Sequence, residues 1–336
     1  MLKGAVIGTG FWSGFQIAAW KELEGVEINA LYNRTVSKAE SLAAKFGIAK
    51  VYASAEDLLT NEALDFVDII TGVETHAGFT ELAAKQNVNV ICQKPMASTL
   101  EEAKGMVDIC RRHNVKLFIH ENFRWQAPIR ALKKCLDSGI IGKPFKARVS
   151  FCSAFPVYGN QPFLKNLDHF ILTDIGSHIL DVCRYLFGEA KSLYCLTQRV
   201  NRSINGEDVA NVLMQMKTGV HCYAEMSYAS LLEKEAFPQT LVLVEGEKGS
   251  LKLTHDFKIK TTTAQGTNTV VIQPKLYQWI DPAYAVAHSS IVDCCRDILS
   301  GLKGESAETT GDDNFRTVQL VWAAYESAQS GKTIIF

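Results

Sequence analysis

The sequence predicts an α/β protein in two parts, a parallel-sheet domain followed by an α+β domain with a large, mostly antiparallel sheet. Two observations predict it. Over about the first 120 residues, short apolar runs alternate with amphipathic stretches, which is the pattern of βαβ units and a sheet covered on both faces. After about residue 144, strand-like runs follow one another with turn pairs between them. We therefore expect domains at 1–122 and 123–336, with the last helix able to pack back on the first domain.

The first part contains five strand candidates. They lie at 2–8, 26–33, 64–71, 89–95 and 115–123. Helices are expected between them, at 13–23, 37–47, 56–61, 76–87 and 98–114. Gly47 is placed to end the second helix, because glycine readily adopts the left-handed conformation of a C-terminal cap. Ser98, with Glu101 or Glu102 after it, is placed to begin the fifth.

The second part reads as eight strands. They lie at 145–155, 190–200, 209–216, 219–229, 239–246, 249–255, 257–263 and 269–273. The turn pairs Asn205-Gly206 and Thr218-Gly219 separate some of them. One helix at about 173–187 interrupts the series, and two helices end the chain.

Composition excludes several classes of protein. The chain of 336 residues has a net charge of -1, with 47% hydrophobic and 21% charged residues, so nothing favours a nucleic acid or an anionic membrane as a partner. No apolar stretch approaches the roughly 18 residues of a membrane span, and the N-terminus does not resemble a signal peptide. We expect a cytoplasmic protein whose nine cysteines are free thiols rather than disulfides or metal ligands.

The segment "GAVIGTGFWSGF" at 4–15 is close to a dinucleotide-binding fingerprint. Gly8 permits a tight turn after the first strand, and Gly10 lets the backbone approach a pyrophosphate at a helix N-terminus. Ser13 stands where the third glycine is usual, a mild change because serine is small. This places an NAD or NADP site in an N-terminal Rossmann domain, with Phe11 and Trp12 of the same loop in contact with the cofactor.

The end of the second strand, Asn33-Arg34, should decide between NAD and NADP. A Rossmann domain that binds NAD usually carries an acidic residue there, which bonds the adenosine ribose. Asn33 can bond a hydroxyl but has no charge to repel a 2′-phosphate, and Arg34 could pair with that phosphate. NADP is therefore allowed, NAD is not excluded, and a solvated Arg34 without a role is the alternative.

Three further motifs carry a family resemblance. "TGVETH" at 71–76, "ICQKPMA" at 91–97 and "LTDIGSHILDVCRYLFG" at 172–188 occur in this order. In this order and spacing the chain resembles the Gfo/Idh/MocA oxidoreductases, relatives of glucose-fructose oxidoreductase and inositol 2-dehydrogenase. The likeness extends through 120–151 and the C-terminal helix, so it covers nearly the whole chain. It implies a dehydrogenase that oxidises a hydroxyl of a sugar or polyol. Oxidation of an aldose to its lactone is one such reaction.

The resemblance also assigns residues. It implies that Lys94, in Gln93-Lys94-Pro95, lies near the nicotinamide, and that Asp174 and His178 form the family's later Asp-x-x-x-His pair. Thr71 and His76 match the family's T-P-N-x-x-H motif, and we expect them, with Gln93, to contact the cofactor. The sequence departs from the family pattern at Gly72, Val73 and Gln93, where proline, asparagine and glutamate are usual.

The residue types suit alcohol oxidation. The cofactor takes a hydride, so the protein must hold the oxygen and accept its proton. An unperturbed histidine titrates at about 6.5, which suits His178 as the base, while the Lys94 ammonium would polarise the oxygen. Asp174 and His178 share a helix face with Asp181 at i, i+4 and i+7. A metal site built from these side chains is a weaker alternative, because no third ligand motif accompanies it.

Other assignments rest on position. Asn122, Arg124 and Trp125 follow a strand end and are candidates to contact substrate, with packing as the alternative for Arg124 and Trp125. A large antiparallel sheet usually has its open face covered by another copy, so a homodimer or homotetramer is expected. Two other functions stay open: a sensor that binds nucleotide or sugar without catalysis, and a closed redox cycle giving epimerisation, elimination or transfer between sugars.

Overall fold

The computed structural model describes residues 1–336, which divide into two compact units. The first unit contains Met1–Asn122 and His288–Val318, and the second contains Phe123–Ala287 and Gln319–Phe336. The N-terminal segment of the first unit thus ends at Asn122. Residues 288–318, which the sequence placed in the second domain, belong instead to the first unit.

The first unit is built on a six-stranded parallel sheet with the strand order β3-β2-β1-β4-β5-β6. Its strands are β1 (Leu2–Ile7), β2 (Val26–Tyr32), β3 (Lys50–Tyr52), β4 (Phe66–Ile69), β5 (Asn89–Gln93) and β6 (Leu117–His120). This doubly wound order places ligands at the carboxyl ends of the strands, next to the β1/β4 switch point. Five strands were expected, and the short edge strand β3 was missed because three residues show no clear period.

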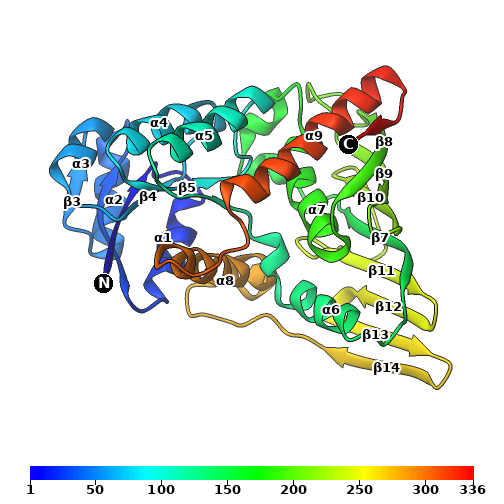
Figure 1. The fold of residues 1–336 in the computed structure, drawn as a ribbon. Coiled ribbons are helices and arrows are strands. Elements are labelled where there is room, and N and C mark those ends of the chain that lie inside the picture. The colour runs from blue at the N-terminus through cyan, green and yellow to red at the C-terminus, as the bar shows by residue number, and fades with distance from the viewer. The chain divides into compact units, whose positions relative to one another are not determined.

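Helices connect these strands. They are α1 (Ser13–Lys21), α2 (Val36–Phe46), α3 (Ala55–Asn61), α4 (His76–Lys85) and α5 (Leu100–Arg112), with a 3-10 turn η1 (Val73–Thr75) before α4. Figure 1 shows α4 and α5 on one side of the sheet and α1 and α8 (Ala285–Leu302) on the other. Gly47 ends α2 with a φ of 68°, as expected. The expected cap Ser98 is wrong by one residue: Thr99 caps α5 by accepting a hydrogen bond from the backbone N–H of Glu102.

The second unit is built on a nine-stranded sheet with the order β14-β13-β12-β11-β7-β10-β9-β8-β15. Its strands are β7 (Pro144–Cys152), β8 (Ala190–Gln198), β9 (Val209–Met216), β10 (His221–Ser227), β11 (Leu241–Gly246), β12 (Gly249–Thr254), β13 (Lys258–Thr263), β14 (Gly266–Val271) and β15 (Ile334–Ile335). All neighbours are antiparallel except β7 and β10. The eight expected strands are present, and the two-residue β15 was missed.

The helices of this unit are α6 (Ala127–Asp137), α7 (Ile171–Phe187) and the C-terminal part of α9 (Gly311–Ser330). Short 3-10 turns lie at η2 (Phe123–Trp125), η3 (Val157–Gly159), η4 (Pro162–Asn166), η5 (His255–Phe257) and η6 (Pro282–Tyr284). The sequence predicted α7 and the two terminal helices but not α6. Pro128 lies in the first turn of α6, where its fixed φ and missing N–H are tolerated.

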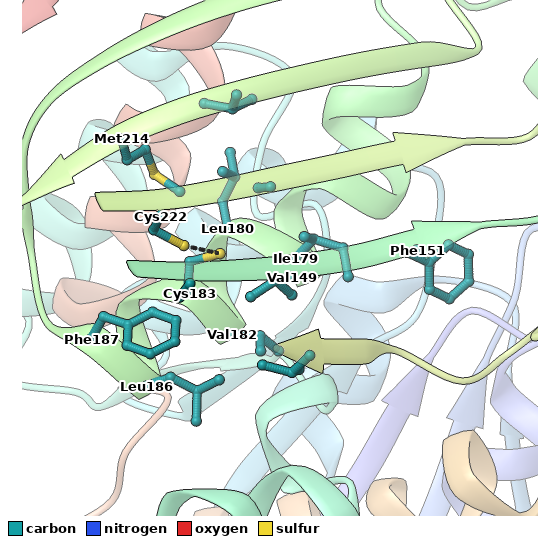
Figure 2. Packing of buried hydrophobic residues seen from close by; sticks show 14 of the residues in the cluster. Val149, Phe151, Ile179, Leu180, Val182, Cys183, Leu186, Phe187, Met214 and Cys222 are labelled. Carbon is teal, nitrogen blue, oxygen red and sulfur yellow. Dashed lines mark hydrogen bonds between the residues drawn. The ribbon is translucent and has the colours of Figure 1, made fainter. Parts of the chain in front are cut away.

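The core of the second unit forms where α7 packs against β7, β9 and β10. Figure 2 shows some of the contributing side chains, with Val149 and Phe151 two positions apart on β7 and a series between Ile179 and Phe187 on α7. Cys183 of α7 and Cys222 of β10 are buried there with their sulfur atoms 3.6 Å apart. Burial raises the pKa of the Cys183 thiol well above its usual value. All nine cysteines are free thiols, as predicted.

No helix in this structure combines the length and the apolar character that a membrane crossing requires.

Candidate active site

The turn after β1 has the geometry of a cofactor loop. Gly8 has a φ of 102°, and a Cβ there would lie 2.4 Å from the carbonyl oxygen of Ile70. Gly10 faces open space, since nothing lies within 4 Å of a Cβ built on it. Gly8 is therefore needed by the fold, whereas Gly10 leaves room beside the loop. No side chain caps α1, and its first turn carries no carboxylate, so the helix end suits an anion.

Ser13, in the place of the usual third glycine, is fully buried and donates a hydrogen bond of 2.9 Å to the carbonyl oxygen of Gly8. The serine thus ties the first turn of α1 back to the end of β1. Its small side chain fits a position that demands close packing, and the hydroxyl adds a contact that glycine lacks. The departure from the fingerprint is therefore compatible with the loop.

An aromatic group adjoins the loop. Phe11, about half exposed, meets Trp12 edge to face with ring centroids 5.2 Å apart. Phe15 stacks on His288 with centroids 4.3 Å apart, and Trp12 lies edge-on to the same imidazole. His288 lies on α8, far from this motif in the sequence, and only the fold places it beside Phe15. The loop thus presents one exposed ring, Phe11, next to the open space at Gly10.

Asn33 is held by the backbone. Its Oδ1 accepts a hydrogen bond from the N–H of Thr9 at 3.1 Å, and its Nδ2 donates to the carbonyl oxygen of Thr35 at 3.0 Å. The side chain therefore braces the glycine turn from the end of β2. Arg34 is exposed, so its guanidinium is the charged group at this strand end that a cofactor phosphate could meet.

Lys94 lies on the loop that follows β5, and His76 contacts this loop from the start of α4. His76 is buried, with Nδ1 3.1 Å from the carbonyl oxygen of Pro95 and Nε2 3.2 Å from that of Thr71. Burial lowers the pKa of this imidazole. His76 thus joins the ends of β4 and β5 at their backbones. The Thr71 hydroxyl accepts a hydrogen bond from Thr75 at 2.7 Å.

A buried polar chain leads from β4 to the backbone of Lys94. Asp68 is fully buried and accepts hydrogen bonds from Trp20 Nε1 at 2.8 Å and from Gln16 Nε2 at 2.7 Å. Gln16 Oε1 accepts from Gln93 Nε2 at 2.6 Å, and Gln93 Oε1 accepts from the Lys94 N–H at 3.0 Å. Burial raises the pKa of Asp68 to about 7, although the bonds from Trp20 and Gln16 lower it.

In the second unit, α7 carries both expected polar residues of the Asp-x-x-x-His pair. His178 is buried and stacks face to face on Phe123, with ring centroids 3.8 Å apart and planes 7° apart. Asp174 Oδ2 accepts a hydrogen bond from the Tyr228 hydroxyl at 3.0 Å. Burial, with Asp174 nearby, raises the pKa of that phenol well above its usual value, so Tyr228 stays a donor to the carboxylate.

Asp181, the third polar residue on this helix face, pairs with Arg124. The guanidinium makes two bonds to the carboxylate, Nε to Oδ2 at 2.7 Å and Nη2 to Oδ1 at 2.5 Å, and both side chains are buried. Arg184 lies 3.8 Å from the same carboxylate. Arg130 lies over the Trp125 ring, 4.2 Å from its centroid. These contacts give Arg124 and Trp125 structural partners, the alternative that the sequence left open.

Asn122 ends the first segment of the first unit. Its Nδ2 donates to the Ser290 hydroxyl of α8 at 2.8 Å. Glu121, just before it, is fully buried. The structure contains no group of three or more histidine, cysteine or carboxylate side chains placed to hold a metal ion.

Several of these residues were not predicted from the sequence. Asp68 had a signal, since a charge inside the apolar run "LDFVDIIT" predicts a buried, hydrogen-bonded carboxyl group. Gln16 and Trp20 had none beyond their helical spacing. Tyr228 lies 54 residues from Asp174 in sequence, and only the pairing of strands brings its hydroxyl to α7.

Comparison with known proteins defines the class. Residues 2–121 match the GFO_IDH_MocA oxidoreductase family with an NAD-binding Rossmann fold, and residues 129–252 match the GFO/IDH/MocA C-terminal domain. The chain belongs to this family and is an oxidoreductase with an NAD-binding domain. The resemblance expected from the motifs is confirmed.

Particular relatives resemble the chain over nearly its whole length. It is 43% identical over 333 residues to a D-apiose dehydrogenase of Paraburkholderia graminis, covering 99% of this chain and 89% of the relative. It is 39% identical to a D-apiose dehydrogenase of Rhizobium rhizogenes, covering 99% and 97%. The structure superposes with a TM-score of 0.97 on an oxidoreductase from Agrobacterium radiobacter in complex with NAD+, L-tartaric acid and magnesium, at 39% identity and coverage of 99% and 98%.

Proposed function

We propose that this protein is an NAD(P)-dependent dehydrogenase that oxidises a hydroxyl of a sugar, with D-apiose and its lactone as the substrate and product to test first. D-apiose is the first substrate to test because two D-apiose dehydrogenases match nearly the whole chain. The observation that carries the dehydrogenase proposal lies in the first unit. Lys94 follows β5 at the same edge of the sheet as the Gly8–Gly10 turn after β1, where an α/β sheet binds its ligands.

The proposed chemistry divides into two transfers. The carbon–hydrogen bond of the substrate breaks and its hydride passes to the nicotinamide, which is the chemistry that the cofactor supplies. The Lys94 ammonium polarises the oxygen as it becomes a carbonyl, and His178 accepts the hydroxyl proton. Stacking on Phe123 fixes the plane of the His178 ring. Asp174, held by Tyr228, binds a substrate hydroxyl or orients the imidazole.

The test is turnover followed at the absorbance of the reduced nicotinamide. Purified protein is assayed with D-apiose, other aldoses and polyols, each with NAD and with NADP. Lys94→Ala and His178→Ala should lower kcat about 100-fold or more, the scale of a lost acid–base group. The exposed Lys85→Ala and His221→Ala are matched controls and should keep the parent rate. Unchanged turnover in the Lys94 and His178 variants would contradict the mechanism.

The same assay separates the other functions. Tight cofactor binding without turnover of any carbohydrate would favour a sensor. Cofactor that purifies with the protein, and does not exchange during turnover, would favour a closed redox cycle.

We propose that the dinucleotide is chosen at Asn33-Arg34, and that the protein uses NAD and accepts NADP. Asn33 carries no charge to repel a 2′-phosphate, and Arg34 is exposed beside it. Arg34→Ala should lower kcat/KM with NADP about tenfold, the scale of one charge-assisted contact, and leave the value with NAD unchanged. An equal loss of kcat/KM with NAD and with NADP would indicate that Arg34 contacts the adenine ring, which both cofactors share, rather than the 2′-phosphate.

We further propose that a second copy of the chain covers the outer face of the nine-stranded sheet. Leu196 of β8 and Leu213 of β9 are more than half exposed, on the face opposite the one that α7 covers. Light scattering should give a dimer or a tetramer, and Leu213→Lys should shift it toward the monomer.

A further inference from the structure

The polar chain from Asp68 to Lys94 has a direction. The Trp20 indole N–H can only donate, so the Asp68 oxygen that it meets at 2.8 Å is an acceptor. Gln16 then presents its NH2 group to the carboxylate and its oxygen to Gln93. Gln93 in turn presents its NH2 group to Gln16 and its oxygen to the Lys94 N–H. The Lys94 backbone N–H, like the Trp20 indole N–H, can only donate. The two ends of the chain therefore require the same orientation of Gln16 and Gln93.

Each amide in this chain passes the direction to the next. An amide has one accepting end and one donating end, so turning over one glutamine would oblige the other to turn as well. Turning both would place the Gln16 oxygen against the Asp68 carboxylate and the Gln93 NH2 group against the Lys94 N–H. Buried mismatches of this kind cost the desolvation of each unsatisfied group. Gln16 and Asp68 are almost completely buried, so water cannot relieve the mismatch between these two side chains.

Glutamate at position 93 would break the chain. An ionised carboxylate can accept the Lys94 N–H, but it also presents an acceptor to Gln16 Oε1. If Gln16 turned to donate to it, Gln16 Oε1 would meet the ionised Asp68 instead. In either arrangement two acceptors face each other inside the unit, which is unfavourable.

We propose that Gln93 is a positioning residue for Lys94, and that Asp68, acting through Gln16, requires glutamine rather than glutamate there. The chain ends on the backbone nitrogen of Lys94 and so fixes where the lysine leaves the loop. The inference rests on the proposed function in one respect, since Lys94 is the group that acts on the substrate. The E-K-P motif has glutamate where this protein has Gln93. Two residues outside the motif, Asp68 and Gln16, explain that difference.

The proposal predicts a specific rescue. Gln93→Glu alone leaves facing acceptors, whereas the double variant Asp68→Asn, Gln93→Glu gives every group a partner with the chain reversed. The new asparagine would accept from Trp20 and donate to Gln16 Oε1. Gln16 Nε2 would then donate to the new glutamate, which still accepts the Lys94 N–H. The exposed Gln86→Glu is the matched control, because it adds the same charge to the same unit outside the chain.

Turnover gives the first measurement, at pH 8. This pH lies above the Asp68 pKa of about 7 and so favours the carboxylate. It is chosen because a protonated Asp68 could itself donate to Gln16. Gln93→Glu should lower kcat about tenfold, the effect of one unmet buried hydrogen bond, with a smaller change in KM for the sugar. The double variant should have a kcat within about threefold of the parent value. The control Gln86→Glu should have the parent kcat. A fast Gln93→Glu variant, or a double variant no faster than Gln93→Glu, would overturn the proposal.

A second measurement does not depend on turnover. Lysines are reductively methylated with 13C-formaldehyde and a borane reductant, and the Lys94 resonance is assigned by its loss in Lys94→Arg. Gln93→Glu should move this resonance, and the double variant should return it toward the parent position. An unmoved resonance would overturn the positioning role even in an active enzyme. If instead Lys94→Ala keeps full activity while the resonance moves and returns, the proposed mechanism fails and the hydrogen-bond chain stands.

Discussion

Ser13 Oγ donates a 2.9 Å hydrogen bond to the carbonyl oxygen of Gly8, inside the turn that joins β1 to α1. The serine stands in the third glycine position of the dinucleotide fingerprint. It binds the end of β1 to the first turn of α1, so the two parts of the loop cannot separate without losing a buried hydrogen bond. The loop is therefore braced at a position where the usual glycine could only pack.

Removing this hydroxyl should weaken the loop. Ser13→Ala should lower the free energy of unfolding by about 1 kcal/mol, the net value of a typical hydrogen bond, and should weaken NAD binding because the turn is less well held. Urea unfolding and NAD titration measure the two effects. Ser37→Ala, which removes an exposed hydroxyl in the same unit, should change neither. Full stability in Ser13→Ala would show that the bond contributes nothing.

The two glycines of the turn should respond differently to alanine. Gly8→Ala should destabilise the protein by more than about 1–2 kcal/mol, because the positive φ and the close Ile70 carbonyl both oppose a Cβ. Gly10→Ala should unfold at the parent temperature yet bind NAD more weakly, since its Cβ fills the open space beside the loop. Gly78→Ala, on the exposed face of α4, is the control for helix effects. Unchanged NAD affinity in Gly10→Ala would remove Gly10 from the site.

Asp68 should make stability depend on pH. Its pKa is about 7 in the folded protein against a usual 3.8. Between these values the folded state holds a proton that the unfolded state has released, so stability falls as pH rises from about 4 to about 7. The full change is roughly 4 kcal/mol, at 1.36 kcal/mol for each pH unit.

Urea unfolding between pH 4 and pH 8 measures this dependence. Asp68→Asn should flatten the fall, while the exposed Glu40→Gln should leave it as in the parent. A slope of the same size in Asp68→Asn would assign the dependence to other groups.

Arg124 should act on stability rather than on substrate affinity. Arg124→Ala leaves the buried Asp181 carboxylate with the more distant Arg184 guanidinium at 3.8 Å, so we expect a loss of about 3 kcal/mol. Replacing both partners, as Arg124→Met with Asp181→Leu, should restore much of it. An exposed ion pair is the control, and Lys104→Ala should cost less than about 0.5 kcal/mol. A variant with parent stability and a raised KM would instead make Arg124 a substrate residue.

Local patterns were enough for most elements. The spacing of apolar residues predicted five of six strands in the first sheet and eight of nine in the second. It failed for β3 and β15, with three and two residues, because so short a run shows no period. It missed α6, because residues 120–151 were assigned by their likeness to the family rather than by their helical spacing. The change in strand and helix pattern after residue 144 also placed residues 288–318 with the second domain, because sequence order gives no sign that a late helix returns to an early sheet.

The sequence by itself determined the chemistry available: a glycine turn after the first strand, a lysine after the fifth and an Asp-x-x-x-His pair on one helix. These depend on short segments whose residue types fix their conformation. Only the tertiary structure decided which partner each side chain has. Hydrogen bonds such as Gln93 to Gln16, or Asp174 to Tyr228, join segments 77 and 54 residues apart, and burial leaves each polar group with whichever partner the packing supplies.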